Sequence, residues 1–442
     1  MRVFVAGATG VLGRRAVPAL AAAGHEVTAL VRSPAKAALA RTLGATPVQA
    51  SLFDPDELRA AIAGHDAVCN LATHIPPLAG AANPRSWEEN SRIRTEGSRN
   101  LVDAALATGV ACYVQESIAF LYGDHGDEWI DASTTPLRDS GPTGPVRAAE
   151  AETARFAAAG GRGVVLRFGG VVASDSDQTL TILRAARRGL AVEPGRGESW
   201  FPSIAADDAA TAVVAALAAP TGTYDVVDDE PLLRRDSRSA LAAAVGRRRL
   251  HAVPSAKRLV GPLADSQRVS NRRFRDATGW APRVACLRDG WPATAAAAGI
   301  EPALSVNVRV LLWLLALGNL GVGIQAAFTP RSFYDDFPLG RGWVAMDGPY
   351  NQHLVRDVGS LNLALVVLVF AALMIGTRTI ARTAMIVWLV NAVPHLVYHL
   401  RHLTMIMPVA DKFGIVATLG FDAVAPLVVL VWTRKRLPAH LR

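Results

Sequence analysis

Four apolar runs in the last third of the chain constrain the fold more than any other feature of its 442 residues. They cover Leu304–Phe328, Val358–Gly376, Ile380–Leu400 and Phe413–Thr433. Each run is close to the ~20 residues that a helix needs to cross a bilayer. A soluble bundle would show polar residues at helical period on every segment, and "LNLALVVLVFAALMIG" shows none over most of its length. The sequence therefore predicts an all-α bundle of four transmembrane helices over residues 301–442.

Arginine residues in the connections predict how these helices are oriented. Arg378 and Arg382 lie between the second and third runs, and the tail reads "TRKRLPAHLR". The long connection Thr329–Asp357 instead balances its arginines with four aspartates. Because Lys and Arg are concentrated in cytoplasmic loops, we expect both chain ends in the cytosol and this connection outside. The expected location is the cell (inner) membrane, crossed several times, with the lipid bilayer as a partner.

Polar residues inside transmembrane helices are costly and usually functional. Asn391, His395 and His399 fall on one stripe of the third predicted helix, and we expect that stripe to point into the bundle. Hydrogen bonds between helices, a pocket for a lipid, quinone or isoprenoid headgroup, and a metal held by His353 and the histidine pair all stay open. Because no tight metal-binding motif is present, we predict no metal. The polar cluster consists of Asn319, His353, Asp357, Asn391, His395, His399 and Asp422.

The first three hundred residues have the mixed composition of a soluble α/β domain. The net charge of the chain is +8, but its arginines form short scattered clusters without a nucleic-acid-binding motif. We therefore expect attraction to anionic lipid headgroups and no nucleic-acid partner. The three cysteines are too far apart to suggest a disulfide framework or a zinc site. The first apolar run is short and broken by glycine, so we expect no signal peptide.

The opening residues "MRVFVAGATGVLGRR" are typical of a strand, a glycine-rich turn and a helix. The strand is predicted at Arg2–Ala6. In this arrangement, the glycines allow a tight turn and a close approach to a pyrophosphate, and the helix N-terminus offers free N–H groups to it. The predicted dinucleotide loop comprises Gly7, Thr9, Gly10, Val11, Leu12 and Gly13.

The end of the second predicted strand, Glu26–Arg32, bears on the choice of cofactor. A protein that binds NAD usually places an acidic residue here to hold the ribose 2′-hydroxyl. This chain has Arg32, with Lys36 nearby, and these cations suit a 2′-phosphate. We therefore predict NADP as the cofactor, and NAD stays open as an alternative.

Several segments together resemble the extended and atypical short-chain dehydrogenases/reductases, which include NAD-dependent epimerases/dehydratases and NmrA-like proteins. They are "GATGVLG", "RTEGSRNLVDAALATGV", "LRFGG", "SIAADDAATAVVAAL" and "GTYDVVDDEP". The resemblance implies an α/β Rossmann-type doubly wound parallel sheet over residues 1–300, with a substrate-binding part in its C-terminal third. It also implies further cofactor contacts from Phe53, Leu71, Ala72, Thr73, Ser117, Phe168 and Gly169.

The chain departs from this family at the catalytic positions. The family's hydroxyl falls on Ile118, one residue from Ser117, and the expected Tyr-x-x-x-Lys window Asp139–Glu152 contains neither Tyr nor Lys. In the family, the tyrosine transfers a proton while the lysine lowers its pKa. The candidates left for catalysis are Ser117, Tyr122 and the pair Thr143 and Arg147, which have the right spacing. Glu116 is a further candidate for the acid.

We interpret the chain as a membrane-tethered NADP-dependent oxidoreductase with a non-standard active site, acting on a lipophilic or lipid-linked small molecule. One alternative is a non-catalytic NADP(H)-sensing domain that regulates the membrane module. A second is an NAD(P)-dependent epimerase or dehydratase. The four-helix module is loosely similar to DoxX-like membrane proteins, and the sequence leaves a homo-oligomer open.

Overall fold

The computed structural model of the protein describes residues 1–81, 83–138, 143–253, 261–402 and 408–434. The chain forms two compact units, Met1–Ile300 and Glu301–Arg442. The start of the predicted Tyr-x-x-x-Lys window (residues 139–142) and most of the basic tail (435–442) lie outside the described residues.

The first unit is built on a seven-stranded sheet in which every pair of neighbours runs parallel. The strand order is β12-β7-β5-β4-β1-β2-β3, so the order reverses between β1 and β4, where such sheets bind ligands at their carboxyl edge. This arrangement confirms the predicted doubly wound fold. The strands are β1 (Arg2–Ala6), β2 (Glu26–Val31), β3 (Thr46–Gln49), β4 (Ala67–Asn70), β5 (Cys112–Ile118), β7 (Arg162–Phe168) and β12 (Gly222–Val226).

Helices cover both faces of this sheet, which is why strands such as β1 and β4 are apolar along almost their whole length. In one core, Val17 of α1 and Val213 of α8 pack together with strand side chains. The other contains Leu58 of α3, Leu101 of α5 and Phe156 of α6. The helices that flank the sheet are α1 (Gly13–Ala22), α2 (Pro34–Thr42), α3 (Pro55–Ile62), α4 (Glu88–Arg92), α5 (Ser98–Ala107), α6 (Gly144–Ala158) and α8 (Ala206–Ala216).

The C-terminal third of this unit adds a smaller core made by Leu183, Leu241, Leu287 and Trp291. Its helices are α7 (Asp177–Arg187), α9 (Arg234–Ala244), α11 (Arg272–Thr278) and α12 (Leu287–Ala297). The short strands of the unit pair two by two: β6 (Trp129–Ile130) with β15 (Arg268–Val269), β8 (Gly170–Val172) with β11 (Ser203–Ala205), β9 (Leu190–Ala191) with β14 (His251–Ala252), and β10 (Trp200–Phe201) with β13 (Leu232–Leu233).

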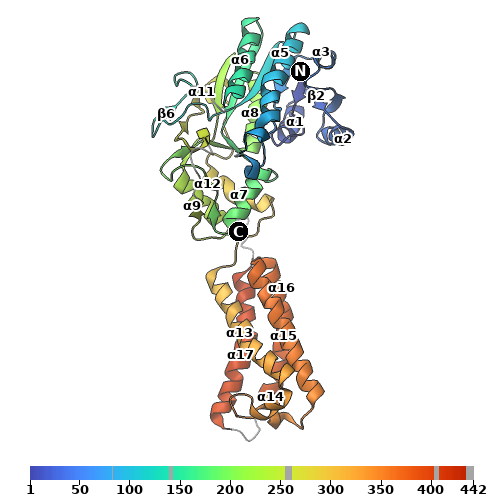
Figure 1. The fold of residues 1–442 in the computed structure, drawn as a ribbon, viewed down its shortest axis with the longest axis vertical. Coiled ribbons are helices and arrows are strands. Elements are labelled where there is room, and N and C mark those ends of the chain that lie inside the picture. The colour runs from blue at the N-terminus through green and yellow to red at the C-terminus, as the bar shows by residue number, and fades with distance from the viewer. Residues whose placement is uncertain (82, 139–142, 254–260, 403–407, 435–442) are drawn as a thin grey trace. The chain divides into compact units, whose positions relative to one another are not determined.

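The second unit contains four helices that are long and apolar enough to cross a membrane. They are α13 (Val306–Phe328), α15 (Gln352–Ile375), α16 (Arg378–Arg401) and α17 (Val409–Trp432), drawn in orange to red in Figure 1. Their shared core includes Leu312, Val369, Met385, Trp388 and Val429. Helices α13 and α15 approach closely at Gly359, where a Cβ would lie 2.3 Å from the backbone nitrogen of Ala327.

Three of the long helices begin before the predicted apolar runs, and polar caps account for two of these displaced ends. Helix α15 begins at Gln352 rather than Val358, after Asn351, whose side chain accepts a hydrogen bond from Leu354 N. Helix α16 begins at Arg378 rather than Ile380, after a similar cap by Thr377. Helix α17 begins at Val409 rather than Phe413. The long connection therefore ends at Asn351, and it contains α14 (Pro330–Asp336) and a 3-10 turn at Val344–Asp347.

The predicted sidedness can be tested with a single introduced cysteine. All three native cysteines are buried in the first unit, so they contribute little background labelling. Ser332 is exposed on α14, within the connection predicted to lie outside. We expect Ser332→Cys in intact cells to react with a membrane-impermeant maleimide. Labelling of this cysteine only after the cells are opened would contradict the predicted orientation.

Candidate cofactor site and active site

The glycine loop between β1 and α1 is folded so tightly that side chains would not fit. Gly7 has a φ of 78°, and a Cβ on it would lie 2.5 Å from the backbone of Leu71. A Cβ on Gly13 would lie 2.2 Å from the carbonyl oxygen of Gly7. Gly10 N donates a 3.0 Å hydrogen bond to that same oxygen. The loop, which also holds Thr9, Val11 and Leu12, thus brings the start of α1 to the carboxyl edge of the sheet.

The N-terminus of α1 is suited to an anion. No side chain caps it and no acidic residue lies in its first turn. Arg14 N and Arg15 N donate to Gly10 O and Leu12 O, so the turn that precedes them, together with the positive end of the helix dipole, is the part suited to a pyrophosphate. Arg15 instead binds two carboxylates from elsewhere in the unit, Asp175 and Asp207, both at 2.8 Å. These ion pairs fix α1 to the segment that follows β8 and to the first turn of α8.

Arg32 lies where a 2′-phosphate-binding cation is expected. It directly follows β2, its side chain is 70% exposed, and Nη1 donates to Glu89 at 3.3 Å. An exposed ion pair of this kind contributes little stability, so the guanidinium can leave Glu89 for a phosphate. Ser33 caps α2 by accepting a hydrogen bond from Lys36 N, which places Lys36 in the first turn. The pairing with Glu89 was not predicted.

Removing Arg32 should therefore change cofactor selectivity. We expect Arg32→Ala to weaken NADPH binding by about 1.5–3 kcal/mol, roughly 10- to 150-fold, and to leave NADH binding nearly unchanged. Titration of both cofactors into the full chain measures this. Arg41→Ala, in the exposed last turn of α2, is the control and should change neither affinity. Equal affinities for NADPH and NADH in the unmodified protein would refute the prediction of NADP.

The other predicted cofactor residues lie at the ends of neighbouring strands. Leu71 N donates to Ala6 O at 2.9 Å, and Ala72 N donates to Asn70 Oδ1 at 3.2 Å, so the segment through Thr73 continues along the edge beside the glycine loop. Phe168 ends β7, and a Cβ on Gly169 would lie 2.8 Å from Ser203 N. Phe53 has the guanidinium of Arg92 stacked on its ring, 3.7 Å from the centroid.

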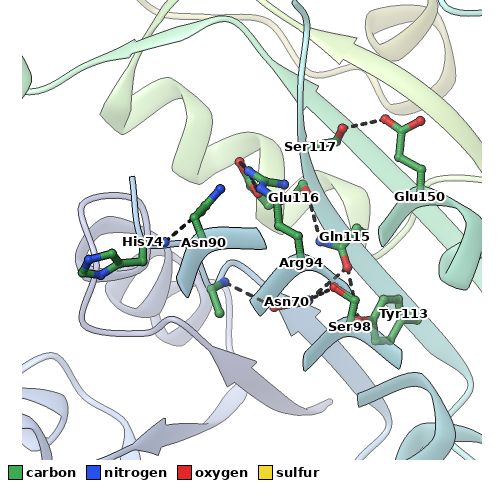
Figure 2. Close-up of polar contacts among 11 residues, drawn as sticks. Asn70, His74, Asn90, Arg94, Ser98, Tyr113, Gln115, Glu116, Ser117 and Glu150 are labelled. Carbon is green, nitrogen blue, oxygen red and sulfur yellow. Dashed lines mark hydrogen bonds and ion pairs between the residues drawn. The ribbon is translucent and has the colours of Figure 1, made fainter. Parts of the chain in front are cut away.

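A chain of buried polar groups runs from Ser117 into the sheet. Ser117 Oγ donates to Glu150 of α6 at 2.5 Å, and Glu150 accepts two hydrogen bonds from Arg167 of β7, at 2.8 and 2.7 Å. Arg167 also donates to the Tyr122 hydroxyl at 2.8 Å, and this hydroxyl donates to Asp225 at 2.7 Å. Figure 2 shows the hydrogen bond between Ser117 and Glu150, with Glu116 and Arg94 nearby.

A second buried ion pair joins Glu116 of β5 to Arg94, whose Nη2 lies 2.8 Å from the carboxylate (Figure 2). Their side chains are 10% and 3% exposed. Arg94 belongs to a π-helical turn, Ile93–Gly97, between α4 and α5, and such turns are frequent at functional sites. Burial raises the pKa of Glu116, as does the nearby Glu150, whereas Arg94 opposes the shift. The site therefore holds two glutamates and two arginines in place of the family's tyrosine and lysine.

Neither of the two hydroxyls in this chain of polar groups, Ser117 and Tyr122, is free. Ser117 and Tyr122 are 0% and 3% exposed, and both are hydrogen-bonded within the protein. Burial, followed by the charge of Asp225, raises the pKa of Tyr122 above its ordinary value, so this phenol is a poor proton donor. Thr143 is buried just before α6, and Arg147 lies in the first turn of that helix.

Sequence reasoning missed Glu150, Asp225 and Arg94 as members of the site. The π-helical turn brings Arg94 to Glu116, and no sequence pattern predicts this turn. Deeper in the unit, Asn70 donates to Ser98 at 3.2 Å and to Gln115 at 3.0 Å, which fixes α5 and β5 to β4 (Figure 2). Asn90 also contributes, because its side chain accepts a hydrogen bond from His74 N at 3.0 Å.

Asp228, just after β12, provides a prediction about pH. Burial raises its pKa to about 7, from an ordinary value of 3.8. The protonated carboxyl therefore stabilises the fold fully below pH 3.8, and this stabilisation is lost as the pH rises through about 7. We expect Asp228→Asn to raise the free energy of unfolding by ~1–3 kcal/mol at about pH 8 and by less at about pH 5. Denaturant unfolding of the full chain at both values measures this; an equal effect at both would contradict it.

The polar residues of the second unit make contacts both between helices and within one helix. Asn319 donates to Asp422 at 3.2 Å, which links α13 to α17. His353 lies 3.4 Å from Asp357 on its own helix, and the Nε2 atoms of His395 and His399 are 3.1 Å apart. No three His, Cys, Asp or Glu side chains among the described residues form a group that could hold a metal.

The histidine stripe of α16 is only partly covered by the neighbouring described helices. His395 is exposed, and His399 and Asn391 are half-buried. The stripe continues the buried face of Trp388 and Ala392, but neighbouring helices do not cover it in the last turns of α16. Helical spacing correctly groups such residues on one face, yet it carries no information about where the packing partners end.

The fold and the glycine loop together define a Rossmann-type domain of the NAD(P)-binding class. The family described as NAD(P)H-binding matches residues 7–220. A 3-diazoavenalumate denitrifying reductase from Streptomyces is 35% identical over 311 residues, which cover 66% of this chain and 99% of that protein. The chain therefore belongs to the NAD(P)H-binding, epimerase-like short-chain dehydrogenases/reductases.

Solved structures agree with this assignment. The human epimerase family protein SDR39U1 with NADPH has a TM-score of 0.55 at 25% identity, covering 67% of this chain and 99% of that one. The UDP-glucose 4-epimerase of Thermus thermophilus with NAD has a TM-score of 0.57 at 22% identity, covering 68% and 99%, and shows the fold alone. Both likenesses extend over no more than about two thirds of the present chain, whose remainder includes the four apolar helices.

Proposed function

We propose that this protein is an NADP(H)-dependent reductase, anchored in a membrane by α13 and α15–α17, that acts on a lipophilic acceptor. The observation that carries the proposal is the glycine loop of an NAD(P)H-binding reductase-like unit on a chain with four apolar helices. The excess of arginine in the predicted cytosolic segments supports a location in the cell membrane with the NADP(H)-binding unit in the cytosol. The likeness to DoxX-like proteins stays a prediction.

The internal hydrogen bonds of the Ser117 and Tyr122 hydroxyls indicate which kind of hydride acceptor the site suits. NADPH, when bound, supplies a hydride. A carbonyl group needs a proton donor as it takes up that hydride, but Tyr122 is held by Arg167 and Asp225, and Ser117 by Glu150. A strongly electrophilic acceptor, such as a quinone, can accept the hydride's electron pair first and take its proton from water or Glu116 afterwards. The Streptomyces relative is named as a reductase of a diazo compound, also an electrophile.

The proposal is tested with the full chain in liposomes, supplied with NADPH and either a long-chain benzoquinone or a small soluble aldehyde. We expect NADPH oxidation with the quinone and little with the aldehyde. Glu116→Gln should slow the reaction and alter its pH profile, because burial prepares this carboxyl to hold a proton. Fast reduction of small soluble carbonyls would show that the active site has been misinterpreted.

A non-catalytic NADP(H) sensor is the second candidate. It is favoured by one observation, that Ser117 and Tyr122 are buried and hydrogen-bonded within the protein. A sensor would bind NADPH tightly but would not oxidise it, whichever acceptor is supplied. The liposome experiment therefore separates the two candidates, provided that cofactor binding is measured in the same preparation.

A further inference from the structure

A carboxyl group near the middle of the membrane unit has an amide as its partner. Asp422 of α17 accepts hydrogen bonds from Asn319 Nδ2 of α13 at 3.2 and 3.4 Å, and the same amide donates to Leu315 O at 3.2 Å. At 1.5 Å per residue, Asp422 lies roughly 20 Å from Val409 and roughly 15 Å from Trp432 along α17. The pair is thus about as far from either membrane surface as the helices allow.

Two other charged groups of this unit lie near helix ends and have partners suited to their charge. Asp411, in the first turn of α17, is buried and forms an ion pair with Arg341. Arg382, near the start of α16, donates to Leu430 O at 2.6 Å and to Thr433 at 3.3 Å. Among the described residues, no Arg, Lys or His side chain pairs with Asp422.

An unpaired carboxylate is expensive in hydrocarbon, and a neutral amide does not cancel its charge. Asp422 therefore needs either a cation or a proton. A metal ion would need further ligands, and no suitable group of three His, Cys, Asp or Glu exists in the described part of the chain. A proton needs neither a cavity nor more ligands. We propose that Asp422 is a proton-binding site of the bundle, whose carboxyl holds a proton and exchanges it with water.

Asn319 makes that exchange feasible. When the O–H bond of Asp422 breaks, the proton passes to water and the electron pair stays on the carboxylate. The Asn319 amide, within hydrogen-bond reach of both oxygens, then stabilises this anion. Both residues are half-buried rather than sealed, so water can reach them. Asn319 is a positioning residue in this account, and the inference is independent of the proposed reductase activity.

Dicyclohexylcarbodiimide tests the proposal, because this apolar reagent reacts with protonated carboxyls shielded from bulk water. The full chain in liposomes is treated near neutral pH, and peptides are mapped by mass spectrometry. We expect an adduct on Asp422 and none on Asp411, whose carboxylate is already paired with the guanidinium of Arg341. Labelling should fall as the pH rises. An unmodified Asp422, or equal labelling of both aspartates, would overturn the proposal.

Asn319→Leu provides a second measurement that does not require altering the carboxyl. Without the amide donor, the anion is harder to form, so labelling of Asp422 should persist to higher pH. An unchanged pH dependence would show that Asn319 does not assist proton release and would overturn that part of the proposal. Unchanged NADPH binding by the variant would confirm that the protein is folded.

Discussion

Replacing Arg167 with methionine is expected to destabilise the NADP(H)-binding unit by about 3–5 kcal/mol. The substitution leaves Glu150 buried with Ser117 as its remaining partner, because Arg167 supplies both of its charge-assisted hydrogen bonds. The Arg167 side chain is only 6% exposed and that of Glu150 11%, so water cannot replace the lost guanidinium. Denaturant unfolding of the full chain, followed by tryptophan fluorescence, measures the loss.

Two further variants separate this effect from a general loss of charge. Arg155→Met, on α6, removes two exposed ion pairs, with Glu152 and Asp103, and should cost no more than about 1 kcal/mol. The double variant Arg167→Met with Glu150→Gln should recover part of the stability, because no uncompensated charge stays buried. Equal losses from Arg167→Met and Arg155→Met would show that the buried network does not have the strength assigned to it.

Substituting alanine for Gly13 is expected to abolish NADPH binding. The new Cβ would lie 2.2 Å from Gly7 O and 2.6 Å from the carbonyl carbon of Ala8, so the loop must open and α1 must move away from the phosphates. Because the overlap is with the chain itself, the protein should also be less stable without cofactor. Calorimetric titration with NADPH and thermal unfolding without it measure the two effects.

Gly10→Ala is the matched comparison. Its Cβ would meet Gly7 O at 3.3 Å, a contact that a small shift relieves, so stability without cofactor should stay near that of the unmodified protein. Binding should still weaken, because the methyl group would occupy space that the pyrophosphate needs. If Gly13→Ala bound NADPH normally, the loop would not hold the cofactor as described.

The sequence was sufficient to predict the sheet, the glycine loop and the number of apolar helices. These features depend on local signals: buried strands without polar residues, glycines at fixed spacing and runs of about 20 apolar residues. The active-site network depends instead on contacts between distant segments. Glu150 and Arg167 come from a helix and a strand, and neither belongs to a motif that would indicate their pairing.

In the membrane unit, too, the contacts between distant segments could not be predicted from the sequence. The stripe that contains His395 was recognised from helical spacing, but its exposure depends on where α13, α15 and α17 stop covering α16. The bond between Asn319 and Asp422 was among the contacts considered only in general terms, because the sequence does not show which helices are neighbours. The caps at Asn351 and Thr377 were missed because they lie outside the apolar runs.

The most direct test of the central claim uses NADPH carrying deuterium at the transferred position of nicotinamide C4. The full chain in liposomes is mixed with this cofactor and a long-chain benzoquinone, and single-turnover oxidation is followed by absorbance. Hydride transfer within the protein predicts oxidation that is slower with deuterium than with hydrogen and is lost in Gly13→Ala. Tight NADPH binding without oxidation would contradict a reductase and favour the sensor.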